Sequence, residues 1–580
     1  MKNILKKFVS VSLALTVMCP FLNVRAAKVG DKIEKVLSTD IVTYIEGVQV
    51  PSFNINGRTA VIVENLNAMG LPFDVWYDDA TRTLSISEGS GGMRDYFHFA
   101  DNESSAPIGT PIMDVLYTDI ETFYQGKKLE SFNIGGFTCV YATDLANMYG
   151  RYTFNELTRS VDIFRKKDEA EGISYSKETD RKLPADESII ERGDTTVRWG
   201  SPQKSYLIKN DDGTFSTIEF SGGLNIETYN SDFEYVSSKK IRIDYPLFGG
   251  FYEGEDYFYV VSGQENQKEN DSLTVINISV YDKKFKKIKD VPVKGCRTTV
   301  PFDACNVSMT ESDDLFVLHT SRSQYKGSNG IAPQTQLTVI VNKENWSVVN
   351  TFDKFQPNHT SHALKGYVKF DKDAIVTANY SDATPVRGAF IQELKPSGEL
   401  VSTSTVLSIP GPASANCTGA MIGGFEVSSS SYITALSTID HSLATDYADT
   451  YIEGVAKEER DVVVAVTDKR KKATKTVPLT FYSDADRTAS VPYLVKLESG
   501  NFMVLWQRFD GFSDNSNTFC YAFLDRNGNL SGEAMQCDGY LSVNCQPVEI
   551  DGKVMWYTNT TSGRVFYEIN SNPLAHNSSK

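Results

Sequence analysis

Residues 316–321 read "FVLHTS", a short run of apolar and β-branched residues of the kind enriched in β-strands. A polar loop follows, then a second such run and a turn, "LTVIVNKENWSV", at 337–348. The same alternation of strand, polar loop, strand and turn recurs along the second part of the chain. Similar runs open at Tyr206, Tyr259, Phe316, Ile375, Tyr432, Phe502 and Val554, with successive spacings of 53, 57, 59, 57, 70 and 52 residues.

Short strands that repeat at this period, with almost no helical pattern, predict small sheets arranged around an axis, which is a β-propeller. We expect about seven blades between residues 195 and 571, with six or eight as the alternatives. The last unit stops at "RVFYEIN", residues 564–570, and is one strand short. We expect "TTVRW", residues 195–199, to supply that strand, so that the ring closes and no sheet edge stays open.

A closer repeat precedes these units. Residues 36–59, "VLSTDIVTYIEGVQVPSFNINGRT", return at 115–138 as "VLYTDIETFYQGKKLESFNIGGFT". Each copy is predicted to form three strands joined by tight turns, then a short helix and two more strands. The turn at Asn56-Gly57 is a strong hairpin signal, and Gly135-Gly136 meets the same need for positive φ in the second copy. The fold class is therefore mainly β, with two small α+β modules (ββαββ-like) before the propeller.

The phrase D-I-x-x-[YF] followed by S-F-N-I-x-G resembles the copper amine oxidase N-terminal-like domain, a stalk module of exported bacterial proteins. The resemblance covers residues 36–86 and 115–164. In that family the module is an extension and not the catalytic part, which implies a role in holding and projecting. The oxidase chemistry is not expected, because Asn379-Tyr380 is followed by Ser381 where an acidic residue is needed. The histidines 359 and 362 also lack the His-x-His spacing for copper.

The N-terminus has the pattern of a secretory signal: the basic "MKNILKK", an apolar run and a cleavage site at Val24-Arg25-Ala26. No later stretch approaches the roughly 18 apolar residues that a membrane helix needs. We therefore expect a secreted or cell-wall-associated protein. The predicted organisation is a signal peptide (1–26), stalk module 1 (31–88), a linker (89–110), stalk module 2 (111–165), a charged linker (166–194) and the propeller (195–571).

Charge and motifs narrow the function. A net charge of −16 and a pI near 5.0 argue against nucleic acid or anionic lipid as the main partner. The chain has no G-x-S-x-G, P-loop, H-E-x-x-H or C-x-x-C pattern, so no cofactor and no metal site is expected.

Candidate ligand-binding residues are taken from the polar loops that follow the first predicted strand of each unit. Arginines beside aromatic residues suit a carboxylate or the face of a sugar. The alternative is that these side chains cap blade loops and pair internally. The candidates are His319, Arg322, His362, Asp382, Arg387, Trp506 and Arg508.

Segments such as "VPYLVKLESGNFMVLW", residues 491–506, are similar to a family of uncharacterised exported bacterial propellers, which implies architecture only. The leading hypothesis is a non-catalytic secreted or cell-surface bacterial protein. Its stalk would present a ligand-binding or adhesive propeller to an extracellular glycan or protein. The alternative is a polysaccharide hydrolase or lyase. A carboxylate pair about 5–10 Å apart at the propeller centre would favour the enzyme, and an apolar pocket lined by arginine and tryptophan would favour binding.

Overall fold

The computed structural model describes most of the chain after residue 26. The chain divides into two compact units, unit 1 and unit 2, with the boundary between Met148 and Tyr149. The predicted signal peptide lies outside the described residues. These are 27–68, 70–89, 96–99, 106–155, 159–165, 168–179, 187–197, 199–352, 362–382, 387–412, 417–448, 451–455, 459–482, 486–511, 513 and 516–572.

Unit 1 contains a closed barrel with the strand order β1-β4-β5-β12-β11-β8. The first copy of the duplicated sequence supplies three of these strands and the second copy the other three. The strands are β1 (Lys32–Leu37), β4 (Ser52–Ile55), β5 (Arg58–Ile62), β8 (Pro111–Leu116), β11 (Ser131–Ile134) and β12 (Phe137–Tyr141). The expected turns are present, with φ of 49° at Asn56 and 59° at Gly135.

The two copies are expected from the sequence to form separate modules, residues 31–88 and 111–165. In the structure they instead share one barrel, to which each copy contributes three strands. Its core joins Val36, Phe53 and Ile62 of one copy to Phe132 and Cys139 of the other. About fifty residues bury too little apolar surface to be stable alone, and sharing a barrel lets each copy cover the other.

The second sheet of unit 1 also mixes the copies, in the order β10-β9-β7-β6. Its strands are β6 (Phe73–Asp78), β7 (Thr83–Glu88), β9 (Glu121–Tyr124) and β10 (Lys127–Leu129), and a further hairpin is β2 (Val42–Ile45) with β3 (Val48–Val50). The helix expected in each copy is a 3₁₀ turn in the first, η1 (Val63–Asn67), and an α-helix in the second, α1 (Ala142–Tyr149).

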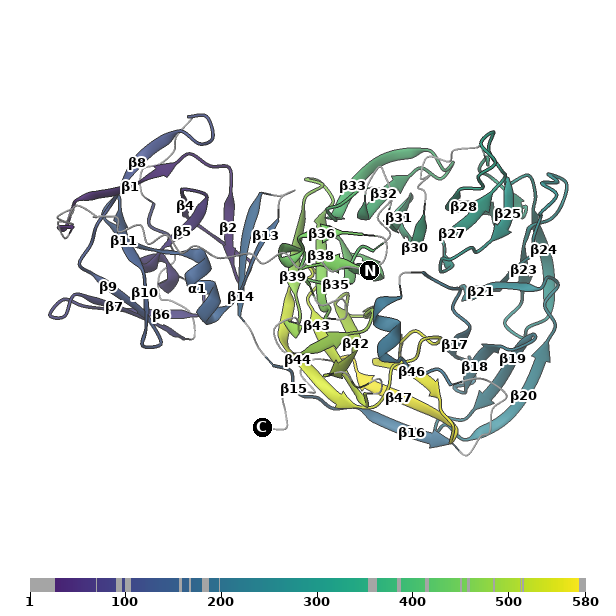
Figure 1. The fold of residues 1–580 in the computed structure, drawn as a ribbon. Helices are drawn as coiled ribbons and strands as arrows, with labels where there is room; N and C mark the ends of the chain where they lie inside the picture. The colour runs from purple at the N-terminus through teal and green to yellow at the C-terminus, as the bar shows by residue number, and fades with distance from the viewer. Residues whose placement is uncertain are drawn as a thin grey trace, which may run out of the picture. The chain divides into compact units, whose positions relative to one another are not determined.

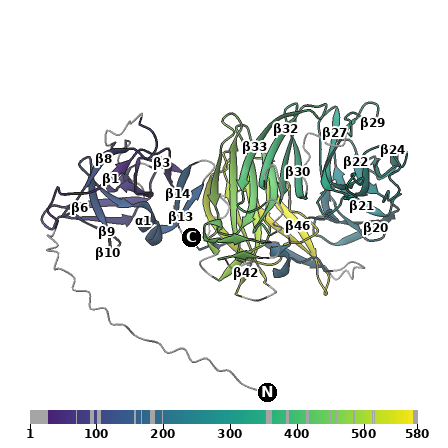
Figure 2. The same ribbon diagram turned by 45° about the horizontal axis from the view of Figure 1, so that its top comes forward.

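Unit 2 begins with the hairpin β13 (Gly150–Asn155) and β14 (Ser160–Arg165) and continues as a ring of sheets (Figure 1). The described residues form seven antiparallel sheets that follow one another along the chain, which is a seven-bladed β-propeller. Figure 2 shows the same blades turned toward their edges.

Blade 1 is β17 (Ser205–Lys209), β18 (Phe215–Phe220), β19 (Leu224–Tyr229) and β20 (Tyr235–Ile241). Blade 2 is β21 (Leu247–Glu253), β22 (Phe258–Gly263), β23 (Ile276–Tyr281) and β24 (Lys287–Val293). Blade 3 is β25 (Thr298–Pro301), β26 (Ser308–Glu311), β27 (Leu315–Gln324), β28 (Gln334–Asn342) and β29 (Ser347–Val348).

Blade 4 is β30 (Ala363–Asp371), β31 (Ala374–Ser381), β32 (Gly388–Leu394) and β33 (Leu400–Ser408). Blade 5 is β34 (Ala420–Val427), β35 (Ser431–Thr438), β38 (Asp461–Asp468) and β39 (Thr474–Pro478). It carries an insert of η3 (His441–Leu443), β36 (Asp446–Tyr447) and β37 (Ile452–Glu453), which accounts for the long spacing in the repeat.

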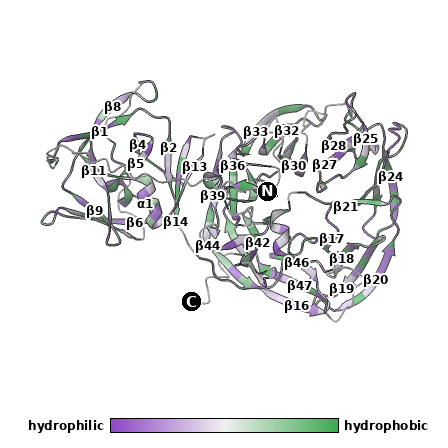
Figure 3. Ribbon diagram, in the orientation of Figure 1, coloured by the Kyte–Doolittle hydropathy of each residue, from purple (hydrophilic) through white to green (hydrophobic). Residues whose placement is uncertain are grey.

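Blade 6 is β40 (Arg487–Ala489), β41 (Tyr493–Lys496), β42 (Phe502–Asp510), β43 (Thr518–Leu524) and β44 (Leu530–Asp538). Blade 7 is β45 (Val548–Ile550), β46 (Lys553–Asn559) and β47 (Arg564–Asn570). Hydrophobic residues line the strands of the ring, where neighbouring blades pack face to face (Figure 3).

The ring is closed by the segment predicted to be a charged linker, and the expectation that residues 195–199 supply the missing strand is wrong. In that segment β15 (Ala170–Glu171) pairs with β44 of blade 6, and β16 (Tyr175–Thr179) pairs antiparallel with β47 of blade 7. Residues 192–196 instead form the 3₁₀ turn η2 (Arg192–Thr196). The residues of β16, "YSKET" at 175–179, are mostly polar, so this edge strand lacks the apolar run that marks a buried strand.

The closure between blades 7 and 1 has a buried charged centre. Arg564 of β47 is 1% exposed and pairs with Glu219 of β18 at 2.9 Å and with Glu227 of β19 at 3.0 Å. Its guanidinium also donates to the hydroxyl of Tyr229 at 3.2 Å and to the side-chain oxygen of Asn559 at 3.2 Å. The last strand of the chain is thus bonded directly to the first blade.

Candidate functional site

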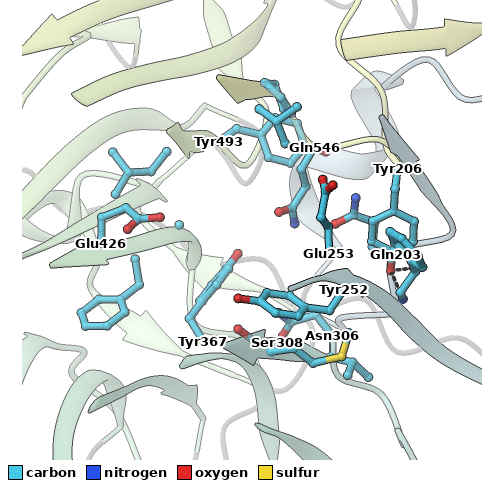
Figure 4. Close-up of a pocket in the computed structure, with 18 of the residues that line it drawn as sticks. Gln203, Tyr206, Tyr252, Glu253, Asn306, Ser308, Tyr367, Glu426, Tyr493 and Gln546 are labelled. Atoms are coloured by element: carbon cyan, nitrogen blue, oxygen red, sulfur yellow. Dashed lines mark hydrogen bonds between the residues drawn. The ribbon is translucent and has the colours of Figure 1, made fainter. Parts of the chain in front are cut away.

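A cavity of about 370 Å³ lies on the axis of the propeller, where the innermost strands of all seven blades meet. Figure 4 shows side chains from several blades pointing into it. Its volume is within the range of roughly 300–1,000 Å³ that is usual for small-molecule sites. The polar and aromatic residues that line it are Gln203, Tyr206, Phe251, Tyr252, Glu253, Asn306, Ser308, Tyr367, Lys369, Phe425, Glu426, Tyr493 and Gln546.

Pairs of glycines bring neighbouring inner strands close together around the cavity. Gly423 and Gly424 lie on β34 of blade 5 and face β41 of blade 6. A β-carbon at Gly423 would lie 1.9 Å from the carbonyl oxygen of Pro492, and one at Gly424 would lie 2.5 Å from Cβ of Leu494. Any larger side chain here would push the two strands apart, so these glycines set the width of the cavity.

Three tyrosines present their rings to the cavity while their hydroxyls bind backbone. The hydroxyl of Tyr367 donates to the carbonyl of Gly423 at 2.8 Å, and that of Tyr493 to the carbonyl of Ser542 at 2.5 Å. The hydroxyl of Tyr206 donates to the carbonyl of Gln203 and accepts from the amide of Phe251 on blade 2. Burial raises the pKa of all three phenols. The three neutral phenols therefore connect parts of the propeller through hydrogen bonds, and they offer a ligand mainly the surface of their aromatic rings.

Two more polar residues of the wall tie blade 3 to blade 4. The amide of Asn306 donates to the carbonyl of Gly366 and accepts from its backbone N–H, both at 2.8 Å. The hydroxyl of Ser308 accepts from the backbone amide of Val368 at 3.0 Å. Gln546 differs, because its side-chain amide has no hydrogen bond to any described residue and points into the cavity in Figure 4. A ligand in the cavity could form hydrogen bonds with this amide.

The cavity holds two carboxylates in different environments, on opposite sides in Figure 4. Glu426 of β34 forms an ion pair with Lys369 of β30 at 2.6 Å. Burial raises the pKa of Glu253 on β21, and Lys283, 3.6 Å away, only partly offsets that rise. Each carboxylate thus has a lysine partner, which is close to Glu426 and more distant from Glu253.

The protein's own chain crosses the end of the cavity at which the inner strands begin. The backbone amide of Ser188 donates to the carbonyl of Asn559 on blade 7 at 3.0 Å, and its carbonyl accepts from the amide of Val543. Further along, the amide of Gly200 donates to the carbonyl of Ala304 before blade 3's inner strand, at 3.1 Å. The described residues 187–197 and 199–203 thus bond to blades 7 and 3, and Gln203 lines the cavity.

None of the seven residues singled out from the sequence is among those that line the cavity. His319 and Arg322 lie on β27, the second strand of blade 3, and are fully buried. His319 bonds to Thr338 at 2.9 Å and to Asn379 at 2.8 Å, and burial lowers its pKa to about 4. Arg322 donates to the carbonyl of Cys296, and burial lowers its pKa to about 10.

The two residues predicted from blade 6 are also structural. The indole of Trp506 is buried and donates to the hydroxyl of Tyr482 at 2.9 Å. Arg508 pairs with Glu169, just before β15, at 3.3 Å and with Asp510 at 3.1 Å. Arg508 therefore helps to hold the closing segment against blade 6.

The remaining three candidates do lie together, at one edge of blade 4. Nδ1 of His362 is 3.0 Å from a carboxylate oxygen of Asp382. The guanidinium of Arg387 donates to the backbone carbonyl of Asp382 at 2.9 Å, and to the carbonyls of Pro410 and Cys417 at the same distance. This cluster joins loops of blades 4 and 5, as the alternative interpretation of internal pairing expects.

The cavity could not be located from the sequence, because the apolar repeat marks the second strand of most blades and not the inner strand. From Tyr259 onward, each run that opens the repeat is the second strand of its blade. Second strands are covered on both faces by neighbouring blades and are the most apolar, whereas inner strands face a polar cavity. The sequence does carry a signal for the inner strands, since "FGGF" at 248–251 and "IGGF" at 422–425 stand on two of them.

No known family model matches the chain, and no curated protein matches it either. Three solved structures are similar to it. They are the WD40 β-propeller domain of Doa1 (10% identity, 64% of this chain and 94% of that one, TM-score 0.36), BamB from Moraxella catarrhalis (10%, 62% and 95%, 0.32) and BBS1N in complex with ARL6DN (7%, 67% and 97%, 0.36). The assignment of a propeller here rests on the sheet order.

Two absences hold for the described residues only. No helix among them is long and apolar enough to cross a membrane. No three His, Cys, Asp or Glu side chains among them come together as a metal site would require.

Proposed function

We propose that this protein binds a small polar ligand, or the end of a glycan chain, in the central cavity of its propeller. The observation that carries the proposal is the convergence of all seven inner strands on one cavity with aromatic walls. Sugars combine apolar ring faces with hydroxyl groups. Tyrosine rings suit the former, and Gln546, Glu253 and the Lys369–Glu426 pair suit the latter.

The setting of this activity is part of the proposal. The signal-like N-terminus and the stalk-like repeat support a secreted or cell-surface bacterial protein whose duplicated segment holds the propeller and presents it. The family of that segment is likewise proposed from its sequence resemblance alone. Binding without catalysis is favoured because the hydroxyls of Tyr206, Tyr367 and Tyr493 are engaged by backbone and Glu426 is paired with a lysine.

One observation supports the alternative, an extracellular polysaccharide hydrolase or lyase. Glu253 and Glu426 face the same cavity, and burial raises the pKa of Glu253. Two carboxylates in unequal environments are the arrangement that a general acid and its partner require in glycoside cleavage. The cavity lacks the arginine and tryptophan expected of a purely binding pocket.

The test is a glycan array probed with the full chain from residue 27, followed by calorimetry with any sugar that binds. A fragment that begins at residue 194 is unsuitable because it lacks β15 and β16. Gln546→Ala should weaken binding about 3–10-fold, the worth of one net hydrogen bond. The matched control is Gln267→Ala, an exposed residue of a blade 2 loop.

Two outcomes would change the assignment. If Gln546→Ala and Glu253→Gln both bind the sugar as tightly as the wild type, the cavity is not the site. If the bound sugar is cleaved and Glu253→Gln stops the release of new chain ends, the protein is the enzyme of the alternative hypothesis.

A further inference from the structure

The sheet β10-β9-β7-β6 of unit 1 has one buried face and one face open to solvent. Leu84 and Ile86 of β7, with Thr122 and Tyr124 of β9, are buried on the inner face. On β6, Trp76 is 76% exposed, which makes it the most exposed large apolar side chain among the described residues. A single exposed apolar side chain is common on protein surfaces, so the neighbours of Trp76 on this face decide whether it belongs to a binding surface.

Strand register places a second aromatic ring beside this tryptophan. Trp76 pairs with Ser85 on β7, Ser85 pairs with Phe123 on β9, and Phe123 pairs with Lys128 on β10. Residues paired in this way project from the same face, so Trp76 and Phe123 flank the small side chain of Ser85. Since neighbouring strands are about 4.8 Å apart, the two aromatic residues stand roughly 10 Å from each other across the sheet.

Polar groups border this aromatic row on both sides. On one side lie Ser87 and Asp74, which pair with each other. On the other side lie Thr83 and the ion pair of Glu121 with Lys128, whose atoms are 2.5 Å apart. The hydroxyls of Ser85 and Ser87 are exposed and make no hydrogen bond within the described residues. The row is thus a flat surface of separated rings with free hydroxyls between them.

In the second copy, the corresponding sheet face packs against another part of the chain. Arg82 and Arg159 hold the same left-handed turn position in the two copies, with φ of 54° and 51°. Counting from them, Thr153 on β13 corresponds to Trp76 and Asp162 on β14 to Ser85. In the second copy this face is covered.

The cover is blade 5 of the propeller. Arg151, two residues before Thr153, pairs with Asp440 and, at 2.6 Å, with Asp461. Asp162 is 9% exposed and is influenced by the charge of Lys475 on β39. The first copy has the same sheet face with a tryptophan in place of the threonine, and within unit 1 that face is uncovered.

We propose that the face formed by Trp76, Ser85 and Phe123 binds an extended, uncharged polysaccharide strand. The apolar faces of pyranose rings stack on aromatic side chains, and their hydroxyls bond to the serine and carboxylate groups at the border. A protein partner would need a continuous apolar centre, whereas here the two rings are separated by serine. A polyanion is disfavoured by Asp74, Asp78 and Glu121 along the border. This site is separate from the ligand proposed for the central cavity.

The test is a depletion assay of the full chain from residue 27 on two insoluble, uncharged polysaccharides, crystalline cellulose and chitin. The wild type should bind at least one of them. Trp76→Ala should weaken that binding roughly tenfold or more, because it removes one of the two rings on which a sugar would stack, and Trp76→Tyr should retain most of it. The bound polymer should also protect Trp76 from oxidation by N-bromosuccinimide.

The matched control is Phe99→Ala, which removes another exposed aromatic ring of unit 1, 68% exposed, and should bind as the wild type does. The melting temperature of each variant shows that the fold is kept, since Trp76 contributes little to the core. The proposal is overturned if no probe retains the wild type, or if Trp76→Ala binds undiminished. It is also overturned if Trp76→Ala abolishes self-association in sedimentation while polymer binding is absent, because the face would then be a protein interface. Loss of the cavity ligand through Gln546→Ala leaves this result unaffected.

Discussion

Replacing Arg564 with methionine tests whether ring closure depends on one buried cation. The substitution keeps most of the side-chain length and removes the charge that Glu219 and Glu227 share. Breaking a buried ion pair by removing one partner costs about 3–5 kcal/mol, and here two carboxylates lose their partner, so we expect the upper end of that range. Domains of this kind unfold with about 5–15 kcal/mol, so the loss is a large fraction of the total.

The assay is urea denaturation at pH 7 of the wild type, Arg564→Met, and a triple variant that also carries Glu219→Gln and Glu227→Gln. The triple variant should recover most of the lost stability, since no uncompensated charge remains. A deficit below about 1 kcal/mol at pH 7, or a triple variant as unstable as the single one, would refute this account of the closure.

Three further predictions concern the packing around the propeller. Burial raises the pKa of Asp162 from 3.8 to about 6, so the folded protein loses stability as the pH rises through this range and the carboxyl group ionises. Asp162→Asn should therefore raise the free energy of unfolding by up to about 3 kcal/mol at pH 7 and leave it unchanged at pH 3.5, as measured by urea denaturation. Because burial lowers the pKa of His319 to about 4, stability should fall by about 3 kcal/mol as pH drops from 6.5 to 4, and His319→Asn should flatten that slope. Gly423→Ala, whose β-carbon would meet Pro492, should lower stability by about 1–3 kcal/mol and weaken cavity binding. Gly193→Ala, whose β-carbon would lie in open space on a backbone without positive φ, should cost less than half as much.

The repeat of short strands predicted the propeller and the number of blades, because alternating strands and turns depend on local sequence. The position of the cavity could not be predicted in the same way. The apolar pattern is strongest where a strand is covered on both faces, so it located second strands such as β27 and β42 and assigned binding roles to buried residues such as His319 and Trp506. Inner strands carry a weaker pattern since one side of each faces polar groups.

Closure also depends on pairing between residues far apart in the chain, which local patterns do not reveal. The strand β16 contains Tyr175 and Lys177 in a charged stretch and becomes a strand because β47 offers it an edge. The same holds for the barrel of unit 1, in which β5 pairs with β12 of the other copy. Turn residues such as Asn56-Gly57 predicted each hairpin but not its partner strands.

The pairing of β16 with β47 has a consequence for how the molecule is made. Tyr175 leaves the ribosome almost four hundred residues before its partner Glu568 does, so this early strand stays without its neighbour through nearly all of synthesis. Such long-range pairing makes folding slow and leaves strand edges exposed in the meantime. Any chain cut short before blade 7 would keep those edges permanently and would be expected to aggregate.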